Sequence, residues 1–175
     1  MNIHSLAIHN SYWVIEGRLR AGEHPGNGPI ADIGNKLKWL NGLGINTIVD
    51  LTENEMVGID YSSLITKVAK DCNTQVNYIN TPIHDFSTPS NEEMIKILDI
   101  VDQELLEHKN IYLHCYGGMG RTGLTVGCYL ARHGIAGIHA LEKIRELRSN
   151  LPEDHKQSPE TDGQIRMVLE WNINQ

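Results

Sequence analysis

The chain of 175 residues is 40% hydrophobic and 21% charged, close to globular averages, which excludes the disordered, collagen-like and low-complexity classes. Its 22 Asp and Glu outnumber its 15 Lys and Arg, and the resulting net charge of −7 argues against nucleic-acid and anionic-membrane partners. Three widely spaced cysteines exclude a disulfide framework, and without a Cys-x-x-Cys pair they argue against a zinc knuckle.

The length favours a single domain over residues 1–175, because two independent hydrophobic cores need a longer chain. Residues 1–10 lack the basic and apolar regions of a secretory signal, and no apolar stretch is long enough to span a membrane. The low cysteine content fits a reducing compartment. We therefore expect a cytoplasmic protein without membrane contact.

Strand and helix signals alternate along the chain. The first half of the chain predicts short strands within 12–21 that break at Glu16-Gly17, a helix from Ile33 that Gly42 and Gly44 end, a strand over 45–51, a helix over 59–71 and a strand over 75–80. A further helix is expected after the capping-box pattern Ser90 to Glu93. The remaining elements are a strand over 111–113 and helices over 122–133, 138–148 and 159–171. Ser158-Pro159 predicts the N-cap and first helical position of the last helix. This alternation predicts an α/β fold of three layers, with a mainly parallel central sheet and helices on both faces.

The turn after the strand over 111–113 carries the strongest chemical signal, because ligands of such sheets bind beyond the carboxyl ends of the strands. Residues 114–123 read His-Cys-Tyr-Gly-Gly-Met-Gly-Arg-Thr-Gly. Glycines let successive backbone N–H groups turn toward an anion, and the N-terminus of the next helix adds positive potential. The predicted phosphate-binding loop consists of Tyr116, Gly117, Gly118, Met119, Gly120 and Arg121.

Two residues of this turn are predicted to do chemistry. Dipoles that bind phosphate also stabilise a thiolate, so Cys115 is predicted to be a nucleophile at neutral pH. Arg121 can bind two phosphate oxygens in a bidentate way that lysine cannot. A buried, inert cysteine is the alternative, since Cys-x5-Arg spacing alone is a weak signal.

Residues 118–123 also match the dinucleotide fingerprint G-x-G-x-x-G. That motif requires a second strand ending in an acidic residue about 20 positions later. The sequence around Glu142 reads as helix instead, and the lysine of a Walker loop is missing. Neither NAD binding nor nucleotide hydrolysis by that route is therefore expected.

The motifs resemble the signature of the cysteine-dependent protein phosphatases, His-Cys-x5-Arg-Thr-Gly, particularly in the small dual-specificity branch. Residues 82–89, Pro-Ile-His-Asp-Phe-Ser-Thr-Pro, resemble the general-acid loop of that branch. The sequence of residues 114–121 is most similar to that of the cyclin-dependent-kinase-associated phosphatases and of bacterial proteins that resemble them. The resemblance covers residues 13–171 and implies the cysteine-phosphatase fold and a protein-tyrosine or dual-specificity phosphatase activity.

Hydrolysis of a phosphomonoester by such an enzyme requires the same groups, a nucleophile and a proton donor. Attack by the Cys115 thiolate on a phosphomonoester gives a phosphocysteine intermediate, and the leaving group needs a proton. We assign that proton to Asp85, which lies after the predicted strand over 75–80 and could then activate water for the second step. The alternatives for Asp85 are a turn aspartate or a weak His84-Asp85 metal pair. No metal or cofactor is needed in this scheme, because Arg121 and the backbone amides supply the positive field.

Three further residues are candidates for supporting roles. Thr122 is placed to hydrogen-bond the sulfur of Cys115, or is an ordinary first-turn threonine. The resemblance implies that His114 orders the loop through hydrogen bonds. Gln164 lies where relatives carry a glutamine that positions the hydrolytic water, with a plain exposed helical glutamine as the alternative.

The expected substrate is a phosphorylated protein. Tyr116 and Met119 occupy positions where phosphoinositide-directed relatives carry lysine. The chain is too short for the segments that deepen the pocket of large tyrosine-specific enzymes, which favours a shallow cleft open to phosphoserine and phosphothreonine as well. Soluble inositol phosphates, nucleotides or a non-catalytic phosphoprotein-binding role are the alternatives, and the presence of Cys115, Arg121 and Asp85 favours an enzyme.

Overall fold

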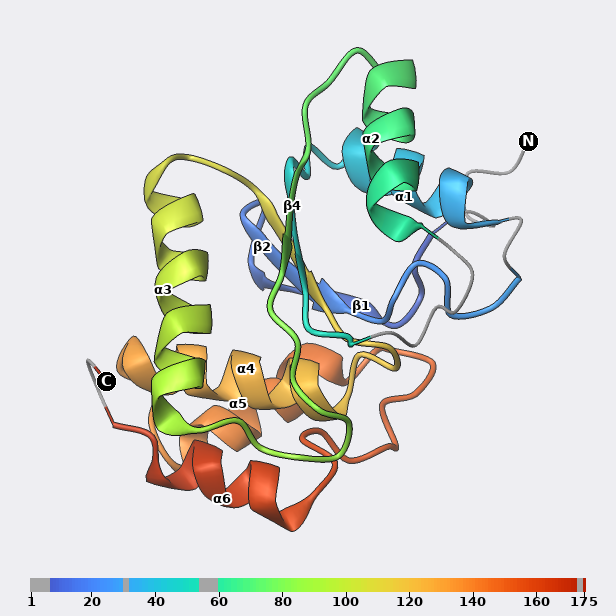
Figure 1. Ribbon diagram of the computed structural model, residues 1–175. Coiled ribbons are helices and arrows are strands. Elements are labelled where there is room, and N and C mark those ends of the chain that lie inside the picture. Colours follow the sequence, from blue (N-terminus) through green and yellow to red (C-terminus); the bar gives the residue numbers. More distant parts are fainter. Residues whose placement is uncertain (1–6, 30–31, 54–59, 173–174) are drawn as a thin grey trace.

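A computed structural model describes residues 7–29, 32–53, 60–172 and 175, and it contains one mixed five-stranded sheet (Figure 1). The strands are β1 (Ser11–Ile15), β2 (Leu19–Gly22), β3 (Thr47–Asp50), β4 (Asn77–Asn80) and β5 (Ile111–His114), in the order β1-β2-β5-β3-β4. β1 and β2 form an antiparallel hairpin, and every other neighbouring pair is parallel. The predicted mainly parallel sheet is therefore confirmed, with β5 at its centre.

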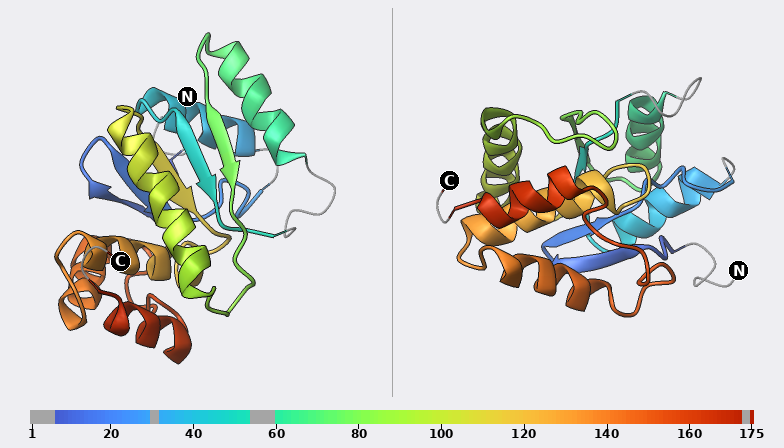
Figure 2. Two further views of the ribbon diagram at one scale, coloured as in Figure 1. Left: turned by 60° about the vertical axis from the view of Figure 1, so that its left-hand side comes forward. Right: turned by 90° about the horizontal axis from the view of Figure 1, so that it is seen from below.

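Helices cover both faces of the sheet, which gives the three predicted layers (Figures 1 and 2). They are α1 (Ile33–Gly42) and α2 (Tyr61–Asp71) on one face, and α3 (Asn91–Leu106), α4 (Gly120–Arg132), α5 (Ile138–Arg148) and α6 (Asp162–Glu170) on the other. None of the helices in the described ranges is long and apolar enough to cross a lipid bilayer.

The central strands are apolar on both faces and supply two separate cores. Side chains alternate along a strand, so Ile48 and Tyr112 pack with α1 and α2, while Val49 and Leu113 pack with the other four helices. Burial on both sides explains why these short strands read as continuous apolar runs in the sequence. It also holds the carboxyl ends of β2, β3 and β5 at one edge of a rigid sheet.

Most predicted elements lie within a few residues of the observed ones, and the capping box of Ser90 and Glu93 at the start of α3 is confirmed. Ile59, the predicted first residue of the second helix, lies outside the described residues. The start of the last helix is the clearest error, because α6 begins at Asp162 and its N-cap is Thr161.

The reason for that error is a stronger cap further along the chain. Thr161 accepts a hydrogen bond from the Gln164 N–H while the Gln164 side chain accepts one from the Thr161 N–H, a reciprocal box that satisfies two backbone donors. The Ser158 hydroxyl instead donates to the carbonyl of Met119, 2.8 Å away, and is therefore part of the loop support rather than of the helix.

Candidate active site

The glycine-rich turn lies at the carboxyl end of the central strand. Cys115 directly follows the last residue of β5, and α4 begins at Gly120, so the turn joins a buried strand to a buried helix (Figure 1). Cys115 is only 2% exposed and packs in the larger hydrophobic core. The strand, turn and helix that the sequence predicts for a phosphate-binding loop are all present.

The turn packs directly against the end of β2. Gly118 has a φ of +72°, and a β-carbon there would lie 2.5 Å from the Glu23 nitrogen and the Gly22 carbonyl carbon. Only glycine combines that backbone conformation with so close an approach. The backbone N–H of His24 donates to the Tyr116 carbonyl over 2.9 Å and fixes the other side of the turn to the same segment.

Arg121 brings the two predicted motifs together. Its guanidinium is 2% exposed, and Nη1 donates to the Ile83 carbonyl over 3.2 Å while Nη2 lies 3.1 Å from Oδ1 of Asp85. The Asp85 side chain is 47% exposed, so the ion pair joins a solvent-accessible carboxylate to a buried guanidinium. The structure thus places the predicted nucleophile loop and the predicted acid loop side by side.

The loop that carries Asp85 is fixed at several points. The Ile83 N–H donates to the Leu51 carbonyl over 3.0 Å, and His84 pairs with Glu53 at 2.9 Å. On the far side, Ser87 accepts a hydrogen bond from the side chain of Gln164 at 3.1 Å. These contacts hold the acid loop next to Arg121 in the absence of substrate.

Gln164 is fully buried, so the alternative of a plain exposed glutamine is wrong. Its Oε1 accepts from the N–H groups of Glu160 and Thr161, and its Nε2 donates to the Ser87 carbonyl. One side chain therefore caps α6 and holds the acid loop. The pattern Thr161-x-x-Gln164 was the sequence signal for the first of these roles.

Thr122 lies beneath the turn, with its hydroxyl accepting from the Cys115 N–H at 2.8 Å and donating to the Gly22 carbonyl at 3.4 Å. These bonds fix the backbone at Cys115. The contact with the Cys115 sulfur that we expect during the reaction stays a prediction.

His114 is completely buried behind the turn. Its Nδ1 lies 3.2 Å from the Cys115 carbonyl oxygen, and its Nε2 lies 3.4 Å from the Tyr61 hydroxyl. This position agrees with a residue that orders the loop and does not reach the opening.

A buried polar cluster surrounds His114. Burial acts to raise the pKa of Asp50, but the nearby His114 and hydrogen bonds from Thr52 and Tyr78 hold that pKa below its ordinary value. Among the described residues, His24, Asp50 and His114 bring ligand atoms within 4.8 Å of one another. Asp50 accepts hydrogen bonds from Thr52 and Tyr78, His24 accepts one from the Gly26 N–H, and His114 contacts the Cys115 carbonyl, so we interpret the cluster as support for the loop.

Two residues in contact with the turn have no motif that marks them. Arg148, the last residue of α5, donates to the Gly118 carbonyl over 3.2 Å, and Ser158 donates to the Met119 carbonyl. Their sequence context predicts only the end of a helix for Arg148 and a helix cap for Ser158. No local pattern distinguishes an arginine of this kind from a solvated one.

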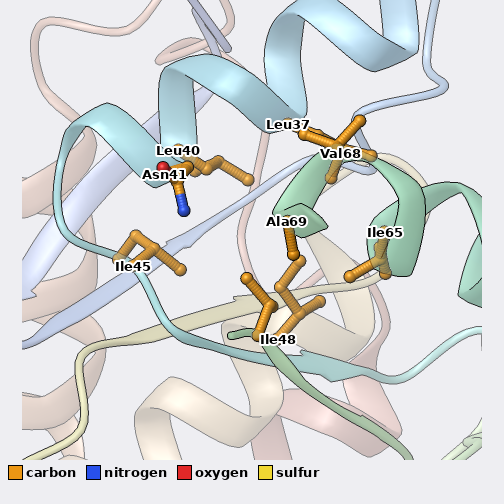
Figure 3. Close-up of a pocket in the computed structure, with 9 residues that line it drawn as sticks. Leu37, Leu40, Asn41, Ile45, Ile48, Ile65, Val68 and Ala69 are labelled. Atoms are coloured by element: carbon orange, nitrogen blue, oxygen red, sulfur yellow. The ribbon is translucent and has the colours of Figure 1, made fainter. Parts of the chain in front are cut away.

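Figure 3 shows a hollow between α1 and α2 that is unrelated to the turn. It is lined mostly by aliphatic side chains, among them Leu37, Ile48 and Val68, and encloses only about 10 Å³ of free space. Phosphate recognition needs charged or N–H donors. This hollow is a packing defect of the smaller core.

The comparisons with known proteins agree with this geometry. A family model described as "Polymorphic toxin system, DSP-PTPase phosphatase" matches residues 24–135, which include both Asp85 and the turn. The "Putative tyrosine phosphatase 067L" of Invertebrate iridescent virus 3 is 37% identical over 101 residues, which cover 55% of this chain and 38% of the viral protein. An uncharacterized protein of Methanocaldococcus jannaschii is 29% identical over 90 residues, 51% of this chain and 52% of that protein. The matches thus span about half or less of these relatives.

Solved structures share the fold over nearly the whole chain. Tk-PTP in its active form aligns with a TM-score of 0.72 at 23% identity, covering 93% of this chain and 95% of that one. Kinase associated phosphatase with its catalytic-site cysteine changed to serine gives 0.69 at 21% identity, with 87% and 84% covered. TpbA of P. aeruginosa in complex with pTyr gives 0.67 at 16% identity, with 93% and 84% covered.

Proposed function

The chain belongs to the DSP-PTPase phosphatase family of polymorphic toxin systems, and from this premise we propose that it dephosphorylates proteins through a phosphocysteine intermediate. The observation that carries the proposal is the meeting of three groups at one opening. Arg121, which closes the glycine turn that begins at Cys115, lies 3.1 Å from Asp85. A phosphoryl group seated in that turn would have a nucleophile below it and a proton donor above it.

The first step transfers the phosphoryl group to sulfur. The Cys115 thiolate attacks phosphorus, the S–P bond forms, and the P–O bond to the leaving group breaks as Asp85 gives its proton to that oxygen. The turn amides and Arg121 bind the non-bridging oxygens, where negative charge is concentrated. Because the incoming phosphate competes for the guanidinium, it also releases the Asp85 carboxyl from its ion pair.

The second step returns the enzyme to its starting state. Water attacks phosphorus, the Asp85 carboxylate takes a proton from that water, and the S–P bond breaks to give inorganic phosphate and the thiolate. Thr122, which already bonds the Cys115 N–H, would turn its hydroxyl to the departing sulfur.

Phosphotyrosine is the side chain we expect to be accepted best, with phosphoserine and phosphothreonine also admitted. Phe86 and Tyr116 are exposed next to Asp85 and Cys115 respectively, and aromatic rims bind an aryl ring by stacking. Neither turn position 116 nor 119 carries the lysine that polyanionic inositol substrates would favour. The name of the viral relative and the pTyr complex of TpbA support the same substrate class.

Residues 1–175 form a single phosphatase domain in this proposal, and we assign it to the cytoplasm. The three free cysteines support a reducing compartment, where the Cys115 thiolate stays active. The partner is a phosphorylated protein, without nucleic acid or membrane.

The test is hydrolysis of para-nitrophenyl phosphate near pH 6 with EDTA and a reductant, beside the Cys115→Ser protein. Activity that persists in EDTA and vanishes in the variant supports the phosphocysteine route. Well-folded protein without activity on this ester or on phosphotyrosine peptides would contradict the proposal and favour a binding role.

A further inference from the structure

The carbonyl groups of the phosphate-binding turn are held from behind by residues outside the turn. The C=O and N–H of a trans peptide point in opposite directions, so a carbonyl fixed at the back directs the next N–H to the front. Two of the partners lie far along the chain from the turn: Arg148 is the last residue of α5, and Ser158 lies in the segment that joins α5 to α6. The Arg148 bond holds the Gly118–Met119 peptide unit, and the Ser158 bond holds the Met119–Gly120 unit together with the bond that the Gly123 N–H donates to the same Met119 carbonyl over 3.0 Å.

Arg148 is the more unusual of the two partners because it is a buried cation. It is 3% exposed, and its guanidinium donates to the carbonyls of Gly118 and Glu153, each over 3.2 Å. None of the ion pairs within the described ranges includes Arg148, and its guanidinium carbon lies 6.0 Å from the centroid of the Tyr12 ring. A buried charge without a carboxylate partner is costly even when carbonyl groups accept its hydrogen bonds, so its position behind an anion-binding turn calls for a reason.

The charge of Arg148 gives that reason. A guanidinium in contact with the back of the turn adds to the positive potential of the inward-facing amides, and low-dielectric surroundings strengthen its effect. The Gly118 carbonyl also polarises its own peptide when it accepts a charge-assisted bond, which makes the following N–H a better donor.

Ser158 reaches the turn only because of a close approach between two segments. Its hydroxyl donates to the Met119 carbonyl over 2.8 Å. A β-carbon on Gly123 would lie 2.2 Å from that hydroxyl oxygen and 3.2 Å from the Pro159 nitrogen. Glycine at 123 therefore leaves room for Ser158, and the bond is built into the packing of α4.

We infer that Arg148 and Ser158 are positioning residues for the phosphoryl group, turning the Met119 and Gly120 N–H groups onto its oxygens from behind. This inference rests on the proposed function, because it assumes that the turn binds an oxyanion. Neither side chain touches the substrate. Their effect is on oxyanion affinity and on the transition state, with little effect on the approach of substrate.

Tungstate, a tetrahedral oxyanion, tests the inference without turnover. We would measure its dissociation constant, and kcat and KM on para-nitrophenyl phosphate, for Arg148→Met, Arg148→Lys and Ser158→Ala. Arg145→Met is the matched control, since Arg145 is exposed on the same helix. Circular dichroism and thermal unfolding establish that each variant is folded.

We expect Ser158→Ala to weaken tungstate binding about 3- to 10-fold and Arg148→Met about 10-fold or more, the usual range for neutral and charged hydrogen bonds. Arg148→Lys should lie between wild type and Arg148→Met, because lysine keeps the charge but lacks the planar fork that spans two carbonyls. kcat should fall more than KM rises, and Arg145→Met should match wild type.

Folded Arg148→Met and Ser158→Ala proteins with wild-type tungstate affinity and kcat would overturn the inference. If Arg148→Met fails to fold, Ser158→Ala decides alone. Wild-type protein that binds tungstate but hydrolyses no ester contradicts the proposed function, and the binding comparison then still tests the two residues. Wild-type protein that binds no tungstate would overturn both.

Discussion

Asp85 and Arg121 form an ion pair across the opening of the candidate active site, with 3.1 Å between Oδ1 and Nη2. Half of the Asp85 side chain is exposed, so solvent screens the pair and it adds little to stability. Its significance is geometric. The pair brings the proposed general acid to the residue that is to hold the phosphoryl group, and the loop contacts around Ile83 and Ser87 keep it there before substrate arrives.

Replacing Cys115 by serine should abolish turnover while phosphopeptide binding persists. A serine hydroxyl in the same turn stays protonated at neutral pH and is a far weaker nucleophile, but the amides and Arg121 are unchanged. Turnover by phosphate release and binding by calorimetry with a phosphotyrosine peptide are the two measurements. Cys72→Ser, a change at a half-buried thiol away from the turn, is the control and should keep wild-type activity. Equal turnover by Cys115→Ser would exclude the phosphocysteine route.

Asp85→Asn should lower kcat/KM, which reports the transfer of the phosphoryl group to sulfur, about 100-fold on a phosphotyrosine peptide, the usual contribution of a general acid. The loss should be smaller on para-nitrophenyl phosphate, because nitrophenolate is a stable leaving group that hardly needs a proton. The ratio of the two losses is therefore the readout, and it is insensitive to a uniform loss of folded protein. Equal losses on both esters would show that Asp85 acts through the loop structure rather than by proton transfer.

Gln164 can be separated into its two functions by two substitutions. Gln164→Glu keeps the oxygen that caps α6 but loses the Nε2 donor to the Ser87 carbonyl, whereas Gln164→Ala loses both. We expect Gln164→Ala to lower the free energy of unfolding by about 1 to 3 kcal/mol. Gln164→Glu should retain most of the capping contribution and still lose kcat, since the acid loop is released. Chemical denaturation and steady-state kinetics on the same preparations test this, and full activity of a stable Gln164→Glu protein would contradict the role in loop positioning.

Whether a site residue could be predicted from the sequence depends on whether its contacts are local or distant along the chain. The turn from Cys115 to Arg121 could be predicted because the residues that indicate it are consecutive in the sequence, with an apolar strand before them and a helix after them. Asp85 could be predicted from a second local motif, but its ion pair with Arg121 depends on how β4 and β5 are placed in the sheet. Arg148 could not be assigned at all, because only the packing of α5 behind the turn distinguishes it from a surface arginine.

The same limit explains the wrong start of the last helix. Ser158-Pro159 has the form of a helix start, yet the competing box of Thr161 and Gln164 satisfies two backbone donors while Ser158 bonds the turn. Only Ser158 is expected as the cap, and the structure instead gives that role to Thr161 while Ser158 makes a tertiary contact with Met119. Both segments contact the site, since Ser158 bonds the turn and Gln164 bonds the acid loop at Ser87.

His24 should make the protein less stable as pH falls below 6.5. Burial, with the nearby charge of His114, lowers the pKa of His24 to about 3 from its ordinary 6.5. Between these two values the unfolded chain binds a proton that the folded protein excludes, so the free energy of unfolding falls by up to about 1.4 kcal/mol per pH unit. Above pH 6.5 His24 makes no contribution to the pH dependence of the free energy of unfolding.

The measurement for His24 is urea unfolding at several pH values from 7.5 to 5, compared with His24→Asn, which retains an acceptor near Nδ1 but does not titrate. The two proteins should differ most at neutral pH and converge as the pH falls. Parallel stability curves over that range would show that His24 accepts a proton in the folded state.

Gly118→Ala should be far more damaging than Gly17→Ala, although both glycines have similar backbone conformations, with φ values of +72° and +68°. Alanine in that left-handed region costs about 1 to 2 kcal/mol at either position. At Gly17 nothing lies within 4 Å of the added carbon, whereas at Gly118 it would meet backbone atoms of Gly22 and Glu23 at 2.5 Å, which cannot give way as a side-chain end would. The turn must therefore move away from β2, so Gly118→Ala should lose tungstate binding and turnover. Gly17→Ala should keep both, and its stability should fall only by the conformational cost. Equal stability and equal activity of the two variants would mean that the turn does not pack against β2 in the active protein.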